Sequence, residues 1–322
     1  MKKSEKNQPA KKQSTKKQPA RKRLLVFMFL IIFTAILVFA SLTFLYTKST
    51  EDEAENMTSS DSDSSMSEAE PEDEVPEIKS IDFQPVVDSW TNSVNGNKSV
   101  LIYDLEKAEI IGSYNLDENY NTASLYKLFV VYEGYRRIES GIWQGDSRAG
   151  STGRTILECL DLAIRESNSP CAETLWAMIG HEELDQIIAD DFDINNSKIS
   201  ILTSNAPDIL KIMQRFYQHP DINDADLLAQ IKDSFLIQPS TTYNWRQGLP
   251  SGFSVANVYN KVGWDYNPDG NYWNIYHDAA IIEFPEDNRH FIVVVMTNRV
   301  PFKKIRELGK MIENKYLESN KY

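Results

Sequence analysis

The chain has 322 residues, 47 of them acidic and 34 basic, and its formal net charge is −13. This acidic balance does not favour contact with nucleic-acid phosphates, so we expect no nucleic-acid partner. The four histidines show no metal-ligand spacing, and His181 lacks the second histidine four residues on that a zinc-hydrolase helix needs. We therefore expect no metal and no cofactor.

The first 46 residues have the pattern of a membrane signal anchor. Residues 1–23 contain ten Lys or Arg and one acid, whereas residues 24–46 contain no charge and are rich in Leu, Ile, Phe and Val. At about 1.5 Å per residue, an apolar helix of that length spans a hydrocarbon core of roughly 30 Å. The basic flank predicts a cytoplasmic N-terminal tail. We therefore expect a single-pass protein of the cell membrane, with everything after Tyr46 outside the cytoplasm.

An acidic, serine-rich stretch follows at residues 47–80. Its central part, 51–77, contains twelve acids and almost no large apolar residue. Such a stretch cannot bury enough surface to offset its ordering entropy, so we expect a disordered linker. It acts either as a plain spacer or as a tether for a cation or a basic partner. The remaining residues, 81–322, suffice for one extracytoplasmic domain of two lobes.

The domain begins and ends with strand-like runs and has helical patterns between them. The strand-like runs are 99–104, 108–114, 255–264, 276–284 and 291–298. The helical patterns are 122–138, 155–165, 170–179, 182–190, 205–217, 224–236 and 301–317. Thr122 is the expected N-cap of the first helix. This order indicates an α+β fold, in which a five-stranded antiparallel sheet flanked by helices adjoins an all-helical lobe across a cleft.

The two cysteines, Cys159 and Cys171, lie in consecutive predicted helices. A location outside the cytoplasm permits a disulfide, which would brace the turn between these helices and needs Cα atoms about 4.4–6.8 Å apart. The alternative is that both are small buried apolar residues. The sequence leaves both alternatives open.

A serine and a lysine three residues apart, Ser124 and Lys127, open the first long helix. One helical turn brings such residues to the same face, where a partly desolvated lysine beside a second cation can accept the serine proton. Chance produces this spacing about once in such a chain, and Ser14 with Lys17 fits it in the basic tail. The plain alternative is that Ser124 caps the helix and Lys127 faces solvent. A rival nucleophile, Ser147, lacks both a preceding strand and a following apolar helix.

Two further motifs follow in order along the chain. Residues 167–169, Ser-Asn-Ser, form a polar turn between two helices, and residues 261–264, Lys-Val-Gly-Trp, lie on a strand. With the motif at 124–127 they form an ordered trio, and in these residues the domain resembles the class A β-lactamases and penicillin-binding proteins. The resemblance extends over most of residues 81–322. It implies a class A β-lactamase-like serine hydrolase.

The resemblance implies a role for each motif residue. Ser124 attacks an amide carbonyl to form an acyl-enzyme, and Lys127 accepts its proton. Ser167 passes a proton to the leaving nitrogen, and Lys261 holds a substrate carboxylate and helps to keep Lys127 neutral. The backbone N–H groups of Ser124 and Trp264 form the oxyanion hole. The implied substrate-binding residues are Asn168, Ser169, Gly263 and Trp264.

Simpler roles stay open for several of these residues. Asn168 and Ser169 are also common turn formers, and Lys261 can serve as an edge-strand charge that opposes aggregation. A geometric expectation separates these alternatives. In an active site, the Lys261 amine lies within about 10 Å of Ser124, since catalytic groups must come within hydrogen-bond reach of a shared substrate.

The chain departs from the family pattern at three places. Ser169 stands where the family has Asn, and Val262 stands where it has Thr or Ser, which removes a hydroxyl that would bind a substrate carboxylate. Class A enzymes also carry a Glu-bearing loop that activates the deacylating water. No Glu-x-x-Asn pattern lies between Gly180 and Thr203. We therefore expect acylation to be favoured over fast hydrolysis.

The leading hypothesis is a membrane-anchored serine hydrolase that forms an acyl-enzyme with a β-lactam or a peptidoglycan-like peptide. One alternative is a D,D-peptidase that acts on cell-wall peptides. Another is a non-catalytic binding or sensor domain, which the substitutions at Ser169 and Val262 favour. In each case we expect a monomer whose ligand is a small molecule or a cell-wall peptide.

Overall fold

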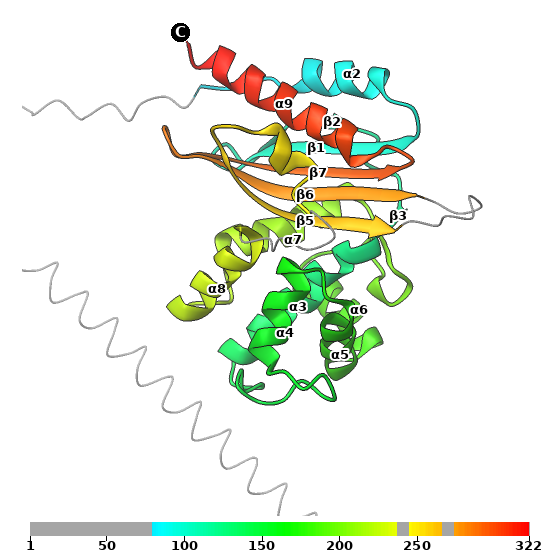
Figure 1. Ribbon diagram of the computed structural model, residues 1–322, viewed down its shortest axis with the longest axis vertical. Helices are drawn as coiled ribbons and strands as arrows, with labels where there is room; N and C mark the ends of the chain where they lie inside the picture. Colours follow the sequence, from blue (N-terminus) through cyan, green and yellow to red (C-terminus); the bar gives the residue numbers. More distant parts are fainter. Residues whose placement is uncertain (1–78, 237–244, 266–273, 322) are drawn as a thin grey trace, which may run out of the picture. The chain divides into compact units, whose positions relative to one another are not determined.

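The computed structural model of the protein describes residues 79–236, 245–265 and 274–321. Its main feature is a five-stranded sheet of order β2-β1-β7-β6-β5, in which every neighbouring pair is antiparallel (Figure 1). The strands are β1 (Asn97–Asp104), β2 (Glu109–Tyr114), β5 (Asn257–Asp265), β6 (Ile275–Phe284) and β7 (Arg289–Asn298). The first hairpin therefore joins the last three strands through β1 and β7, which confirms the predicted α+β fold.

One face of the sheet is covered by two helices from the ends of the domain, α2 (Gln84–Ser93) and α9 (Phe302–Ser319) (Figure 1). Buried side chains of both helices pack against the sheet in one apolar cluster. The indole Nε1 of Trp90 in α2 donates to the carbonyl oxygen of Lys304 in α9 at 2.7 Å. The sequence patterns predicted α9, whereas α2 was not foreseen.

The other face of the sheet packs against the predicted helical lobe. The helices are α3 (Tyr126–Glu139), α4 (Ile156–Arg165), α5 (Ser169–Ile179), α6 (His181–Asp190), α7 (Ala206–Gln218) and α8 (Ala225–Leu236). A second apolar cluster joins these helices to the sheet residues that point away from α9, such as Leu101, Ile281 and Val294. A small second sheet pairs β3 (Tyr120–Asn121) with β4 (Thr203–Ser204).

The expected N-cap at Thr122 is wrong. Its side chain makes no capping hydrogen bond, and its hydroxyl oxygen is buried without a hydrogen-bond partner. The chain instead enters a short 3₁₀ helix, η2 (Ala123–Leu125), and α3 begins only at Tyr126. Ala123 has a φ of 42°, in the left-handed region that L residues rarely adopt. The local capping signal is therefore overridden by the tight turn before Ser124.

Nothing in the described ranges tests the predicted membrane anchor. Residues 1–78, which include the basic tail, the apolar run 24–46 and nearly all of the expected linker, lie outside those ranges. Among the residues that the structure does describe, no helix is both long enough and apolar enough to span a membrane. At the start of the described part, the amine of Lys79 donates to the carbonyl oxygen of Ser319 at 2.7 Å.

A disulfide joins Cys159 in α4 to Cys171 in α5, with the two Cα atoms 4.8 Å apart. Both residues are almost fully buried. The sequence left open whether the two cysteines form a disulfide or are separate buried residues, and the structure has the disulfide. The bridge closes the chain around the turn that contains Ser167, so it ties together the two helices on either side of that turn.

Replacing both cysteines by alanine should lower the free energy of unfolding by about 3 kcal/mol, because the bridge restricts a loop of about a dozen residues in the unfolded chain. Denaturant unfolding of the oxidised wild type and the double variant measures this difference. The reduced wild type serves as the control and should resemble the variant. Equal midpoints for the oxidised wild type and the variant would contradict the stabilising role.

Candidate active site

The predicted site residues come together where the helical lobe meets the edge strand β5. Ser124 lies in η2 and Lys127 in the first turn of α3, so a single turn brings their side chains to the same face. The amine Nζ of Lys127 lies 3.2 Å from Ser124 Oγ. Ser167, from the turn between α4 and α5, lies between Lys127 and Lys261 of β5. Three segments far apart in the sequence therefore supply one hydrogen-bonded cluster.

Lys127 is fully buried and its amine has four oxygen neighbours. Besides Ser124 Oγ, these are the carbonyl oxygen of Ser167 at 2.5 Å, Ser169 Oγ at 3.0 Å and Ser167 Oγ at 3.3 Å. A carbonyl oxygen can only accept, so one N–H of Lys127 is donated to Ser167. A neutral amine can donate its second N–H to Ser169, which leaves its lone pair for the Ser124 hydroxyl.

The second amine, Lys261 Nζ, is also buried, with 1% of the residue exposed. It donates to Ser167 Oγ at 2.9 Å and to the carbonyl oxygen of Val262 at 2.8 Å. The hydroxyl of Ser167 is therefore in contact with both lysine amines. This single oxygen links Lys261 to Lys127, and through Lys127 to Ser124, as the geometric expectation requires.

Burial shifts both amines towards their neutral form. It lowers the pKa of Lys127 to about 8, while the charge of Glu173 acts in the opposite direction. Burial also lowers the pKa of Lys261 well below its ordinary value, and the charge of Lys127 lowers it further, whereas Asp278 raises it. Two buried ammonium groups that share one hydroxyl repel each other, so the pair readily loses a proton near neutral pH.

The turn that carries Ser167 is held in an uncommon backbone conformation. Ser167 has a φ of 54°, which lets both its carbonyl oxygen and its hydroxyl reach Lys127. The next residue, Asn168, is the N-cap of α5, and its side-chain oxygen accepts from the backbone N–H of Cys171 at 3.0 Å. Asn168 therefore positions the turn through its cap, and a direct contact from it to a substrate stays a prediction.

Gly263 lets β5 approach the chain just before the serine. A Cβ atom at this position would lie 2.7 Å from the carbonyl oxygen of Thr122, closer than side chains allow. The segments that carry Ser124 and Trp264 are therefore in direct contact. Trp264 is half-buried, and its ring centroid lies 5.7 Å from that of Trp245. This arrangement suits an oxyanion hole built from the backbone N–H groups of Ser124 and Trp264.

A buried carboxylate that sequence analysis missed lies behind the site. Asp278 of β6 is fully buried and accepts from Asn260 Nδ2 and from the backbone N–H of Leu249, each at 2.8 Å. Burial raises its pKa to about 7, against the lowering effect of these hydrogen bonds and of nearby cations. The available signal was an acid directly before the apolar run 279–282 of the strand. Its effect on Lys261 is electrostatic, since no hydrogen bond joins the two.

The rival serine does not have a catalytic environment. Ser147 is exposed in the loop before α4, where its backbone carbonyl oxygen accepts from Ile156 N at 2.9 Å. Within the described part of the chain, its hydroxyl contacts no lysine or histidine. It therefore lacks the base that a serine nucleophile needs.

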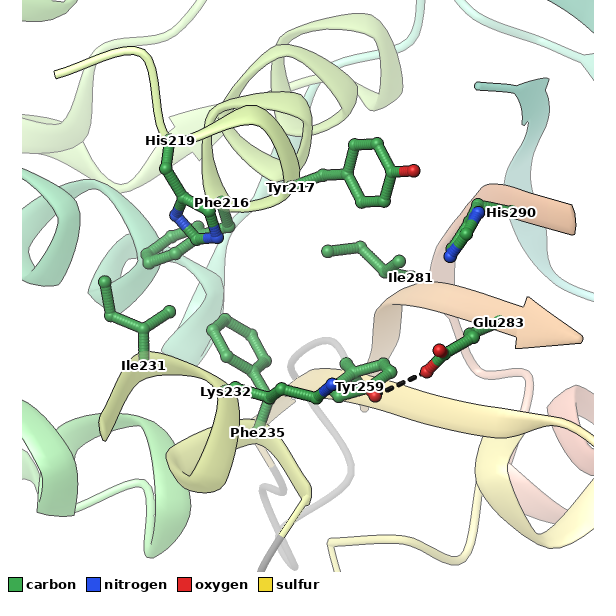
Figure 2. Close-up of a pocket in the computed structure, with 10 residues that line it drawn as sticks. All are labelled: Phe216, Tyr217, His219, Ile231, Lys232, Phe235, Tyr259, Ile281, Glu283 and His290. Atoms are coloured by element: carbon green, nitrogen blue, oxygen red, sulfur yellow. Dashed lines mark hydrogen bonds between the residues drawn. The ribbon is translucent and has the colours of Figure 1, made fainter. Parts of the chain in front are cut away.

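A cavity of about 180 Å³ lies elsewhere, between α7, α8 and strands β5 to β7 (Figure 2). Its apolar part includes Phe216 and Phe235, and its polar part includes Tyr259, whose hydroxyl donates to Glu283 at 2.5 Å. None of the predicted site residues lines it. We therefore place the candidate active site at the serine–lysine cluster, because of the chemistry of its side chains, and not at this cavity.

The protein-family comparison decides the assignment. The model described as the β-lactamase enzyme family matches residues 82–316, most of the chain. The protein belongs to the β-lactamase enzyme family. Comparison of the sequence with curated proteins finds no match.

Solved structures agree with this family at the level of the fold. The class A β-lactamase of the last common ancestor of Gram-negative bacteria matches with a TM-score of 0.61 and 16% identity, over 73% of this chain and 99% of that chain. A class A β-lactamase representative from Bacteroides cellulosilyticus matches with a TM-score of 0.63 and 12% identity, over 73% of this chain and 97% of that chain. At these identities the similarity establishes the fold alone.

Two substitutions distinguish this family member near the cluster. Ser169, which stands where the family has Asn, is exposed at the start of α5, and its hydroxyl oxygen accepts from the amine of Lys127. Val262 is buried, and it packs in the apolar cluster beneath α9. As a valine, it provides no hydroxyl at this position of β5.

The segment between Gly180 and Thr203 carries no replacement for the family's deacylating acid at the cluster. Asp185 accepts from the backbone N–H of Ile199 at 2.6 Å, and Asp191 pairs with Arg136 at 2.9 Å. Arg136 lies nine residues after Lys127 along α3, which corresponds to about 13 Å of helix. No acid of this segment, which the structure describes throughout, forms a hydrogen bond with Ser124 or Lys127.

The capping role of Asn168 is testable by matched substitutions. Asn168→Ala should lower the free energy of unfolding by about 1 kcal/mol, because the N–H of Cys171 loses its acceptor. Asn168→Asp keeps a carboxylate oxygen at the N-cap and should retain wild-type stability. Denaturant unfolding measures both variants, and equal losses in the two would show that the cap is not what Asn168 contributes.

Proposed function

We propose that the protein is a membrane-anchored serine hydrolase that forms an acyl-enzyme through Ser124 with a β-lactam or a peptidoglycan-like peptide. The observation that carries the proposal is the contact of 3.2 Å between Ser124 Oγ and the amine of the fully buried Lys127. A buried lysine with a lowered pKa is a suitable proton acceptor for a serine hydroxyl. Membership of the β-lactamase enzyme family supports the same reaction class.

Acylation follows from the order of contacts in the cluster. The Ser124 hydroxyl gives its proton to neutral Lys127 as Oγ bonds to the carbonyl carbon of the substrate. The negative charge that develops on the carbonyl oxygen is stabilised by the N–H groups of Ser124 and Trp264. When the C–N bond breaks, the nitrogen takes the proton of the Ser167 hydroxyl. Ser167 then recovers a proton from the Lys127 ammonium, because the two side chains are in contact.

Deacylation is the slow half of the proposed reaction. Hydrolysis of the ester needs a base that deprotonates a water molecule beside the carbonyl carbon. The acids between Gly180 and Thr203 are not bonded to the cluster, so the proposed base for this step is again Lys127, which contacts Ser124. We therefore propose an enzyme that is acylated efficiently and releases the acyl group slowly.

The location proposed for this chemistry comes from the sequence alone. The uncharged run 24–46, with its basic flank on the N-terminal side, supports one membrane helix with a cytoplasmic N-terminus. The domain at 81–322 then lies outside the cytoplasm, where cell-wall peptides and β-lactams are accessible. The disulfide between Cys159 and Cys171 is consistent with an oxidising compartment.

Two alternative functions would use the same site residues. A D,D-peptidase would turn over a peptide that ends in D-Ala-D-Ala faster than a cephalosporin. A binding or sensor domain without catalysis is favoured by Val262, since the site lacks the hydroxyl that helps to hold a substrate carboxylate. Turnover of the two substrates by the purified protein separates the peptidase from the β-lactamase-like enzyme, and the absence of any acyl adduct would favour the binding domain.

Covalent labelling tests the proposed nucleophile and base. Intact mass spectrometry after incubation with a fluorescent penicillin should detect an adduct on the wild type and none on Ser124→Ala. Lys127→Ala should slow labelling by at least about a hundredfold, which is the usual range for loss of a general base. Ser147→Ala is the matched control and should label like the wild type. Persistent labelling of Ser124→Ala would overturn the assignment.

The lifetime of the adduct tests the proposed rate limit. Because no acid is bonded to the cluster, the wild-type acyl-enzyme should persist for minutes or longer after free penicillin is removed. Time-resolved loss of the label measures this lifetime. Turnover of a β-lactam at tens per second would contradict slow deacylation and would require a base other than Lys127.

A further inference from the structure

A histidine that the sequence motifs did not single out connects the two halves of the site. His277 lies in β6 directly opposite Gly263 of β5, and it is fully buried. Its Nε2 atom lies 2.8 Å from the carbonyl oxygen of Asn121, and the backbone N–H of Thr297 donates to its Nδ1 atom at 2.9 Å. These contacts join β6 to β7 on one side and to β3 on the other.

The two partners select one form of the ring. The Thr297 N–H can only donate, so Nδ1 must accept, and a neutral ring then carries its hydrogen on Nε2. That hydrogen is donated to the carbonyl oxygen of Asn121. Burial lowers the pKa of His277 to about 4, although its hydrogen bond to Asn121 acts in the opposite direction. The ring is therefore neutral at neutral pH and satisfies both partners.

The carbonyl that His277 holds lies three residues before the serine. The side chain of Asn121 also accepts from the backbone N–H of Ala123 at 2.9 Å, so the tight turn before Ser124 starts from a residue that is held at both its carbonyl and its side chain. On the other side, a Cβ atom at Gly263 would lie 3.0 Å from Cδ2 of His277. The ring is thus packed between the segment that carries Ser124 and the strand that carries Trp264.

We propose that His277 is a positioning residue for the acylation described above, because it sets the spacing between the backbone N–H groups of Ser124 and Trp264. This inference rests on the proposed function. An oxyanion hole works only when both donors lie about 2.7–3.1 Å from the same oxygen. A displacement of about 1 Å in such a site can cost a hundredfold in rate. Loss of the bond to Asn121 frees one of the two segments to move.

Two amide substitutions separate the two hydrogen bonds of the ring. In His277→Gln the amide nitrogen replaces Nε2 and can still donate to Asn121. In His277→Asn the amide oxygen replaces Nδ1 and can still accept from Thr297, but the bond to Asn121 is lost. We expect His277→Asn to lower the acylation rate constant about a hundredfold with an unchanged dissociation constant for the noncovalent complex, and His277→Gln to stay within about fivefold of the wild type.

The matched control is His290→Asn. His290 lies in β7, seven residues before Thr297 or about 23 Å along the strand, and its ring contacts Glu106 instead. This variant should acylate like the wild type. Denaturant unfolding of all variants checks folding. Wild-type acylation rates in His277→Asn, or equal losses of rate and stability in the Asn and Gln variants, would overturn the positioning role.

A structural readout keeps this inference separate from the proposed function. If the wild type itself forms no adduct, the proposed function fails, and the positioning role is then decided by crystal structures of the variants. The positioning role requires the distance between the Ser124 and Trp264 backbone nitrogens to change in His277→Asn and to stay at the wild-type value in His277→Gln. Identical distances in all three proteins would overturn it.

Discussion

The site depends on the burial of two lysine amines around one hydroxyl group. Lys127 comes from the helical lobe and Lys261 from the sheet, and Ser167 Oγ contacts both. Burial lowers the pKa of Lys127 to about 8, and it lowers the pKa of Lys261 well below its ordinary value, with the charge of Lys127 lowering it further. The arrangement exists only while the lobe and the edge strand stay together. In the proposed reaction, Ser124 is therefore activated by contacts from several parts of the fold rather than by its own helix alone.

Several separate interactions keep the amines in place. The disulfide between Cys159 and Cys171 and the cap at Asn168 hold the turn that contains Ser167. The absence of a side chain at Gly263 allows β5 to lie against the segment before Ser124. In the proposed reaction, these contacts would serve the acylation step. No acid of the segment 181–203 forms a hydrogen bond with Ser124 or Lys127. The described contacts therefore support the proposed acylation and offer no comparable support for deacylation.

The spacing of apolar residues predicted most of the fold, because each strand or helix buries its apolar side chains at regular intervals along the sequence. The apolar runs that became β6 and β7, and the helical spacing that became α4 and α7, were found close to their predicted bounds. The helix at Gln84–Ser93 was missed. Its apolar side chains pack beneath α9, more than two hundred residues later in the chain, and no local pattern encodes that contact.

The contact between Ser124 and Lys127 was predictable, because residues three apart in a helix lie on the same face. The residues that position them were not. Thr122 resembles a helix cap, yet its carbonyl oxygen lies where a side chain at position 263 would be, and the turn at Ala123 prevents a cap. His277 contacts Asn121 across 156 positions of sequence, so its sequence neighbours contain no signal of that contact.

The charge state of Lys127 decides whether this residue can accept the Ser124 proton, and it can be measured. Nuclear magnetic resonance of ¹⁵N-labelled lysine side chains, with the Lys127 signal assigned by its absence in Lys127→Ala, follows each amine through a pH titration. We expect the Lys127 amine to lose its proton with a midpoint near pH 8, because burial lowers its pKa to about 8. A Lys127 amine that stays charged above pH 10 would rule out Lys127 as the proton acceptor.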